Sequence, residues 1–376
     1  MMVRRIVLIL LFAWVGVLGV NARQPDQQTL FLTFIPNIQF APIYMAGEKG
    51  YFAENNLTVT FEYGDENVGV DMLAINQRQF GIISGEEVIK SRAAGRPLVS
   101  VFEWFQKYPV GIVYPDNSGI ESLADLKGRK VGIPGRFGAS YNGLIAILAA
   151  NDLVEADIQL EPIGFNAADV FCVGGVEASV VYVSNEPLQI QQRADAGQCN
   201  GISGVSVFPV ADSADMVSNG LVTNEETLNN NPDLVQRMVN AYHLGLQSAI
   251  NNPAETYLLS ANQVENLPLD DAFRAALEAA SVAQAEFLAT NPDREAVAAS
   301  RDALWQQLTQ QFDSATLLQF RVLLNSIELW DADVLGYADE SSWITTQEVL
   351  TTMGFVTTPI DVTAAFTNQF LPQSEG

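Results

Sequence analysis

The chain has 376 residues, and its 44 acidic residues against 19 basic ones give a formal net charge of −25 at pH 7. Such a surface repels nucleic acids and anionic membranes, so we expect no nucleic-acid partner. One histidine and two cysteines give little support to a Ser/His/Asp triad or a histidine-rich metal site, and we predict no catalytic or metal-binding residues. The length exceeds what one hydrophobic core usually supports, which favours two lobes.

The first residues have the pattern of a secretory signal peptide. Arg4 and Arg5 precede an apolar run at residues 6–20, and a Val-Asn-Ala segment follows at 20–22. The run is shorter than the roughly 20 residues that a membrane span needs. We predict a signal peptide at residues 1–22, with an uncleaved anchor as the alternative. The protein is then exported, to the periplasm or the outer face of the cell membrane.

The two cysteines, Cys172 and Cys199, lie far from the predicted cleavage site and have no CxxC spacing. An exported protein meets an oxidising compartment, where such a pair favours a disulfide over a redox or metal site. Two buried free thiols are the alternative. The only histidine, His243, lies in a predicted helix, where we interpret it as a half-buried or surface residue.

The first part of the chain alternates strands and helices. Strands are predicted at residues 30–35, 57–63, 80–84, 99–105 and 110–114. Helices are predicted at residues 41–50, 68–76 and 86–94. Alternation at this spacing indicates an α/β protein with a mostly parallel sheet covered on both faces.

A second unit begins after the loop at residues 115–119. It contains predicted strands at 130–133 and 178–183 and a glycine-lined loop that opens a helix ending at 151. The segment 221–223 resembles a returning strand, and long alanine-rich helices follow from 234 onward. We therefore predict that lobe 2, residues 113–220, is inserted in lobe 1, residues 23–112 and 221–376. The lobes then meet at two hinge crossings, placed near 111–114 and 219–223, with a ligand cleft between them.

Four segments, taken in order, resemble substrate-binding proteins of ABC importers related to the thiamine-pyrimidine-synthesis family. They read PNIQFAPIYMAGEKGYF at 36–52, WFQKYPV at 104–110, LADLKGRKVGIPG at 123–135 and SNGLVTNE at 218–225. The resemblance implies the type II periplasmic-binding-protein fold, with two lobes and two hinge crossings. It also implies a permease partner at the membrane, and we expect the binding protein itself to be a monomer.

The first two segments look closer to the riboflavin-binding branch of these proteins than to the pyrimidine-binding one. The resemblance thus implies riboflavin as a transported ligand rather than a cofactor. A thiamine-precursor pyrimidine, formylaminopyrimidine or hydroxymethylpyrimidine, is the alternative. The yeast-type synthases of the broad family use a sacrificial histidine and a cysteine-rich iron motif, which this chain does not match, so we predict a binding protein and not an enzyme.

Candidate ligand-binding residues in the first lobe follow the strands or lie beside the first crossing. Asn37 and Gln39 come after the first strand, at the end where ligands bind in open α/β sheets, and their amides suit the edge of a heterocycle. A turn-forming Asn and a solvated Gln are the alternative. Tyr44 would wall the cleft or pack in the core. Glu86 would accept a ring N–H or be an ordinary helix-start carboxylate.

Further candidates are aromatic. Trp104 and Tyr108 lie beside the first crossing, where one of them would stack on a flat ligand. Phe137 and Tyr141 lie at the glycine-lined loop and helix start of the second lobe, where backbone amides can hold an anion or hydroxyl. Arg136 would add positive charge there, and a plain tight turn is the alternative.

The last candidates, Tyr182, Asn185 and Glu186, end a strand of the second lobe. A surface turn accounts for them equally well. An exported hydrolase that pairs Glu86 with Glu186 is the remaining alternative function, although no motif asks for it. The segment from 330 to 370 is interpreted as a packing extension of the first lobe.

Overall fold

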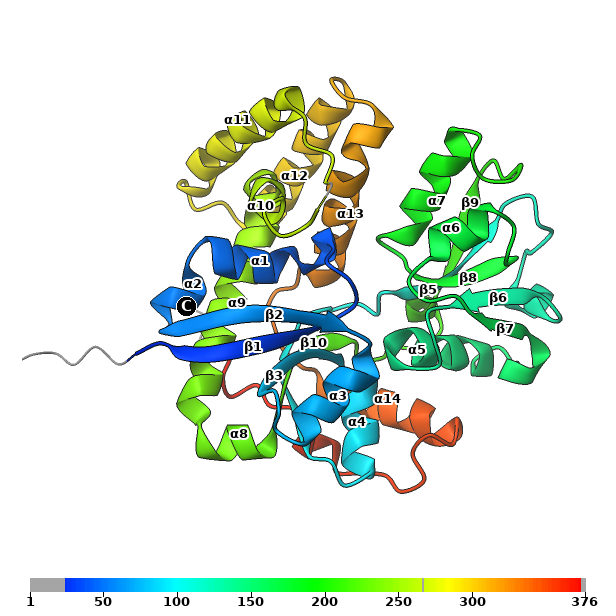
Figure 1. Cartoon of the computed structure of the whole chain (residues 1–376), viewed down its shortest axis with the longest axis horizontal. Helices are drawn as coiled ribbons and strands as arrows, with labels where there is room; N and C mark the ends of the chain where they lie inside the picture. Colours follow the sequence, from blue (N-terminus) through cyan, green and yellow to red (C-terminus); the bar gives the residue numbers. More distant parts are fainter. Residues whose placement is uncertain (1–23, 266, 373–376) are drawn as a thin grey trace, which may run out of the picture.

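The computed structural model describes residues 24–265 and 267–372 (Figure 1). The predicted signal peptide, residues 1–22, lies outside the described residues. Two five-stranded sheets form the centres of two lobes that lie side by side. Among the described residues, no helix is long and apolar enough to cross a membrane.

The sheet of lobe 1 has the strand order β2-β1-β3-β10-β4. Its strands are β1 (Asp26–Thr33), β2 (Leu57–Gly64), β3 (Phe80–Ser84), β4 (Leu98–Glu103) and β10 (Asn219–Asn224). The first three strands pair in parallel, with Leu30 opposite Phe80, whereas β10 is antiparallel to both β3 and β4. Continuous apolar runs such as Phe80–Ser84 are fully buried, as expected for strands covered on both faces.

The sheet of lobe 2 repeats this arrangement in the order β7-β6-β8-β5-β9. Its strands are β5 (Val110–Pro115), β6 (Lys130–Ile133), β7 (Gln159–Pro162), β8 (Ala178–Tyr182) and β9 (Val205–Pro209). Here β5 is antiparallel to both of its neighbours. The mostly parallel sheet that the sequence predicts is thus two mixed sheets, each with one reversed strand, because each reversed strand follows a connection between the lobes.

Helices cover both faces of each sheet (Figure 1). Those of lobe 1 are α1 (Ala41–Glu48), α2 (Tyr51–Glu54), α3 (Glu66–Ala74), α4 (Gly85–Ala93), α8 (Glu225–Asn230) and α9 (Pro232–Asn251). Those of lobe 2 are α5 (Gly138–Ala149), α6 (Ala167–Cys172) and α7 (Glu186–Asp195). Short 3-10 helices occur at Ile38–Phe40 (η1), Leu123–Leu126 (η2), Glu155–Asp157 (η3), Val210–Asp212 (η4) and Val362–Ala364 (η5).

The C-terminal third is helical and packs on lobe 1. It contains α10 (Pro253–Ser260), α11 (Asp271–Leu288), α12 (Arg294–Thr309), α13 (Ser314–Trp330) and α14 (Glu340–Thr352). Four of these helices begin after an aspartate whose carboxylate accepts a backbone N–H of the first turn, which fixes where each helix starts. Trp343 is buried among side chains of β3, β10 and α4, so the end of the chain is part of the core of lobe 1.

The chain passes from lobe 1 to lobe 2 between β4 and β5, at residues 104–109, and returns between β9 and β10, at residues 210–218. The predicted crossings at 111–114 and 219–223 instead fall on β5 and β10, because these segments already pair within their sheets. Each connection therefore lies earlier in the sequence than predicted. The exact lobe boundaries at 112/113 and 220/221 stay a prediction.

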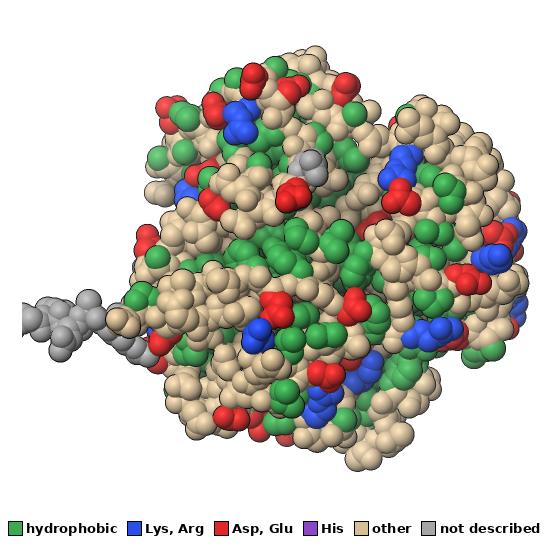
Figure 2. Space-filling model, in the orientation of Figure 1, with side chains coloured by type: hydrophobic (Ala, Val, Ile, Leu, Met, Phe, Trp, Pro, Cys, Tyr) green, Lys and Arg blue, Asp and Glu red, His purple; other side chains and the backbone are tan. Residues whose placement is uncertain are grey.

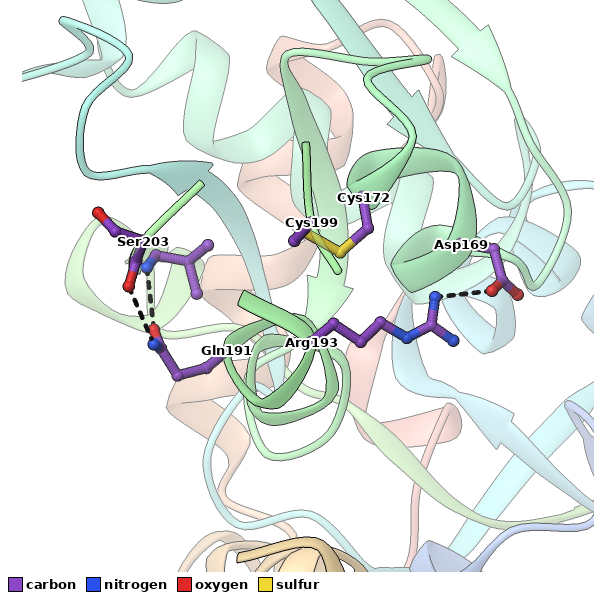
Figure 3. Close-up of a disulfide and its surroundings, with 7 residues drawn as sticks. Asp169, Cys172, Gln191, Arg193, Cys199 and Ser203 are labelled. Carbon is purple, nitrogen blue, oxygen red and sulfur yellow. Dashed lines mark hydrogen bonds and ion pairs between the residues drawn. A yellow bond between two sulfur atoms is a disulfide. The ribbon is translucent and has the colours of Figure 1, made fainter. Parts of the chain in front are cut away.

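A disulfide joins Cys172, at the end of α6, to Cys199, which follows α7 (Figure 3). Both cysteines are buried in a cluster on one face of the lobe 2 sheet. Arg193 of α7 also pairs with Asp169 of α6, with Nη1 and Oδ1 2.7 Å apart. These contacts hold α6 and α7 together.

Candidate functional site

A pocket that is partly open to solvent lies between the two lobes. Its wall in lobe 1 comes from the ends of β1 and β3, from η1 and from the first crossing, and its wall in lobe 2 comes from the ends of β6, β7 and β8. Ligands of open α/β sheets bind at the carboxyl ends of the strands. Figure 2 shows apolar side chains gathered near the middle of the molecule, where the lobes meet.

Aromatic side chains from both lobes dominate the lining. Those that line the pocket are Phe34, Phe40, Trp104, Phe105, Phe137, Phe165 and Tyr182. Phe34 and Phe165 meet across the cleft, with ring centroids 4.7 Å apart in an edge-to-face arrangement. Phe34 has φ 146°, a value that non-glycine residues rarely adopt, so the backbone is strained where lobe 1 contacts lobe 2.

Trp104 lies in contact with three other aromatic rings in lobe 1. Its ring centroid lies 5.9 Å from that of Phe40, 4.7 Å from that of Phe105 and 5.5 Å from that of Trp330. The residue is 2% exposed, and its Nε1 has no hydrogen-bond acceptor among the described residues. A buried N–H without an acceptor costs free energy.

Amides and hydroxyls connect the lobes at the pocket. Gln39 donates from Nε2 to Ser184 Oγ at 3.1 Å, and Ser326 of α13 lies at 3.1 Å from the same oxygen. Tyr182 donates to Asn219 Oδ1 at 2.8 Å. The two lobes are thus in contact through polar side chains at the pocket.

Two carboxylates line the pocket. Glu186 accepts the backbone N–H of Tyr182 at 2.9 Å, and Glu66 accepts those of Ser84 at 2.5 Å and Ala139 at 3.2 Å. Burial raises the pKa of each carboxyl to about 7, and for Glu66 the neighbouring charge of Glu87 adds to this effect. Both groups therefore titrate near neutral pH.

A third buried carboxyl, Glu86, lies outside the pocket lining. The Tyr108 hydroxyl is within hydrogen-bond distance of both Glu86 Oε1 and the Ala139 carbonyl oxygen. Burial raises the pKa of Glu86 to about 8. Since a phenol carries one proton, a neutral Glu86 that donates to Tyr108 leaves Tyr108 free to donate to Ala139.

Five of the predicted ligand-binding residues line the pocket. They are Gln39, Trp104, Phe137, Tyr182 and Glu186. Each follows a strand of one of the two sheets, ends one, or begins the helix after it, as the sequence analysis assumed. That they bind a ligand stays a prediction.

The other predicted residues lie elsewhere, in structural roles. Asn37 caps η1 by accepting the Gln39 N–H at 2.9 Å. Tyr44 is buried in the core of lobe 1, with its hydroxyl 3.0 Å from that of Tyr63. Glu86 and Tyr108 bind each other as described. Tyr141 donates to Glu155 at 2.7 Å, and Asn185 accepts from Gln189 at 2.7 Å.

Several lining residues were not predicted from the sequence. They are Thr33, Phe34, Phe40, Glu66, Phe105, Ser140, Phe165 and Asn219. Phe34 and Asn219 lie at strand ends, a signal that was available. Phe165 was missed because β7, which it follows, reads Gln-Leu-Glu-Pro and lacks the apolar pattern of a strand.

No cluster of metal-ligating side chains exists within residues 24–265 and 267–372. His243 lies on α9, partly buried, with its ring 6.1 Å from that of Phe102, and burial lowers its pKa. It takes no part in the pocket. Arg136, next to Phe137, pairs with Glu155 at 2.9 Å and is not among the lining residues.

Comparison with solved structures identifies the fold. The periplasmic aliphatic sulphonate binding protein SsuA from Escherichia coli superposes with a TM-score of 0.61 at 15% identity over 94% of each chain. A ligand-binding component of an ABC-type import system from Staphylococcus aureus gives a TM-score of 0.58 at 11% identity, over 92% of this chain and 97% of that one. The predicted α/β class and type II periplasmic-binding-protein fold are confirmed.

Comparison with characterised sequences identifies relatives. The riboflavin-binding protein RibY of Chloroflexus aurantiacus is 32% identical over 94% of this chain and 88% of that protein. A 4-amino-5-hydroxymethyl-2-methylpyrimidine phosphate synthase of Legionella pneumophila is 23% identical over 61% of this chain and 72% of the synthase. A family model described as NMT1/THI5 like matches residues 37–256. The chain therefore belongs to the NMT1/THI5-like family, as its four sequence segments predicted.

Proposed function

We propose that this protein is the extracytoplasmic solute-binding component of an ABC importer and that it binds riboflavin. The observation that carries the proposal is the pocket between the lobes, which aromatic rings from both lobes line. A flat ring system fits between such faces, and each aromatic pair contributes about 1 kcal/mol beyond area burial.

The lining also offers groups that match the polar edge of a flavin. Gln39 and Asn219 carry amides, and the Trp104 N–H lacks a protein acceptor. An isoalloxazine ring presents carbonyl oxygens, ring nitrogens and one N–H at its edge, so both donors and acceptors find partners. The relative from Chloroflexus aurantiacus, named a riboflavin-binding protein, supports this ligand.

The proposed setting of the protein follows from its relatives. The Escherichia coli structure is named a periplasmic binding protein and the Staphylococcus aureus one a component of an import system. We accordingly infer export and a membrane permease as the partner. That the binding protein is a monomer stays an expectation from the sequence. Neither a cofactor nor a catalytic step belongs to this function.

Absorption spectroscopy and titration test the proposal. The protein as purified should be yellow, with flavin bands near 450 nm, or should bind added riboflavin with a Kd below about 10 μM. Calorimetry with stripped protein supplies the Kd. A stripped, folded protein that binds no riboflavin at 100 μM would refute the ligand.

The second candidate is an aminopyrimidine ligand, and the relatives named as pyrimidine synthases favour it. Competition between hydroxymethylpyrimidine and riboflavin in the same titration separates the two. The exported hydrolase is disfavoured, because Glu86 does not line the pocket that Glu186 lines. Turnover of a substrate that Glu86→Gln abolishes would restore that alternative.

A further inference from the structure

The pocket combines aromatic side chains with acidic groups and, among the described residues, with no basic ones. The acidic residues of the lining are Glu66 and Glu186. Within the described residues, no Lys, Arg or His lines the pocket. Both carboxylates are held by backbone N–H groups, so neither can swing away from the pocket without losing hydrogen bonds. The lining therefore fixes two acidic groups beside whatever ligand enters.

The start of α5 would otherwise suit an anion, because the first turn of a helix presents free N–H groups and a positive dipole end. Here the protein fills that position itself. Ala139 donates its N–H to Glu66 at 3.2 Å, and Gly138 donates its own to Glu87 at 3.3 Å. These carboxylates come from lobe 1, whereas α5 belongs to lobe 2, so contact between the lobes occupies the anion position.

The cations closest in sequence to these residues are already paired. Arg136 binds Glu155, with Nη2 and Oε1 2.9 Å apart, on the exposed side of its loop. Lys90 binds Glu87 at 2.7 Å and Asn142 at 3.3 Å. A phosphate or carboxylate on the ligand would meet acidic groups in the pocket and no unpaired cation to balance it.

We propose that the cleft selects uncharged heteroaromatic ligands against their phosphorylated forms, and that Glu186 and Glu66 are the residues responsible. For a flavin ligand, which rests on the function proposed above, riboflavin is accepted and riboflavin 5′-phosphate is rejected. The reason is electrostatic. A phosphate brought close to a carboxylate in a partly desolvated cleft is repelled far more strongly than in water.

The experiment measures the affinity of the full exported chain for two matched ligand pairs by calorimetry at pH 8. The pairs are riboflavin with riboflavin 5′-phosphate, and hydroxymethylpyrimidine with its phosphate. Burial raises the pKa of both carboxyls to about 7, so at pH 8 most of both groups are ionised. The variants are Glu186→Gln and Glu66→Gln, which keep the shape and remove the charge, with Glu177→Gln as the control. Glu177 pairs with Arg129 and does not line the pocket.

We expect the phosphorylated member of the bound pair to bind about 100-fold more weakly than its parent. Glu186→Gln should reduce the ratio of the two dissociation constants about 10-fold, and Glu177→Gln should leave this ratio unchanged. If only the pyrimidine pair binds and shows this ratio, riboflavin is wrong as the ligand but the charge selection stands.

Three results would overturn the inference. The first is equal or tighter binding of a phosphorylated ligand. The second is an unchanged ratio in both variants while their circular dichroism matches that of the parent protein. The third is a folded protein that binds none of the four compounds, because the cleft then does not take uncharged heteroaromatic ligands of either kind.

Discussion

Trp104 shows how a single residue can report the ligand. Its indole ring is locked among Phe40, Phe105 and Trp330, whereas its N–H has no acceptor. In Trp104→Phe the ring packing is largely kept and the donor is lost. We expect about 5-fold weaker ligand binding, since a hydrogen bond contributes about 1 kcal/mol. Calorimetry measures this change.

Trp330 supplies the matched control for this substitution. Its Nε1 is also buried without an acceptor, but it does not line the pocket. Trp330→Phe should therefore lower stability no more than Trp104→Phe and leave ligand affinity within about 2-fold. Equal loss of affinity in both variants would mean that the effect passes through packing and not through the donor.

At this scale the sequence predicts residues that end strands better than residues that lie on helices. Gln39, Tyr182 and Glu186 were found because the end of a parallel strand marks the ligand edge of a sheet. Tyr141 lies outside the lining, and for Tyr44 the sequence left the cleft wall and the core open, because the face that a helical residue presents depends on how the helix packs. Tyr44 turns toward Tyr63 in the core, which no local pattern shows.

At the start of α5, a residue with positive φ also lies against the other lobe. Gly138 has φ +64°, and a Cβ there would lie 2.0 Å from Glu66 Oε2. Gly138→Ala should thus strain the backbone and push Glu66 away from the helix. We expect a loss of stability of 2 kcal/mol or more in urea unfolding, of which about 1 kcal/mol comes from the positive φ.

Gly119→Ala separates the effect of the positive φ from the effect of the contact with Glu66. Gly119 has φ +72°, yet a Cβ there would meet nothing within 4 Å. Gly119→Ala should lower the free energy of unfolding by only about 1 kcal/mol, the part that comes from the positive φ. If Gly138→Ala lowers stability no more than Gly119→Ala does, Glu66 moves away from the new Cβ without a loss of stability.

The disulfide acts on the pair α6 and α7. It closes a loop with a sequence separation of 27, for which chain entropy predicts about 3.5 kcal/mol of stabilisation. The double variant Cys172→Ser, Cys199→Ser should lose stability of this order in chemical unfolding. Adding a reductant to the parent protein should have the same effect and none on the variant.

Elements with strong apolar patterns were predicted with nearly correct bounds, and polar ones were not. Residues 80–84 and 130–133 are mostly apolar, and both are strands. In contrast, β7 and β9 lie at the edges of the lobe 2 sheet and are partly exposed, so they lack a continuous apolar run. Their positions follow from pairing with strands distant in sequence.

Across the whole molecule, buried carboxyl groups between the lobes make stability depend on pH. Burial raises the pKa of Glu86 from 4.5 to about 8. Between these values the folded state binds more protons than the unfolded state, so the free energy of unfolding falls as pH rises from 5 to 8. The slope is about 1.4 kcal/mol per pH unit for one group.

Urea unfolding at pH 5, 6, 7 and 8 measures this slope. Glu86→Gln should reduce the slope by about 1.4 kcal/mol per pH unit, the contribution of one group, because the amide does not titrate. Glu177→Gln is the control: its pKa is lowered by Arg129, so its contribution changes below the pH range used. A slope that Glu86→Gln leaves intact would show that Glu86 is ionised in the folded protein.

The topology also has a consequence for how the protein forms. Strand β10 lies between β3 and β4, yet in the sequence it follows all of lobe 2. The strands of lobe 2, by contrast, come from one continuous segment. In a chain that emerges from its N-terminus, lobe 2 can complete its sheet before residue 219 is available, and lobe 1 cannot. We therefore expect lobe 1 to complete its sheet after lobe 2, when β10 pairs with β3 and β4.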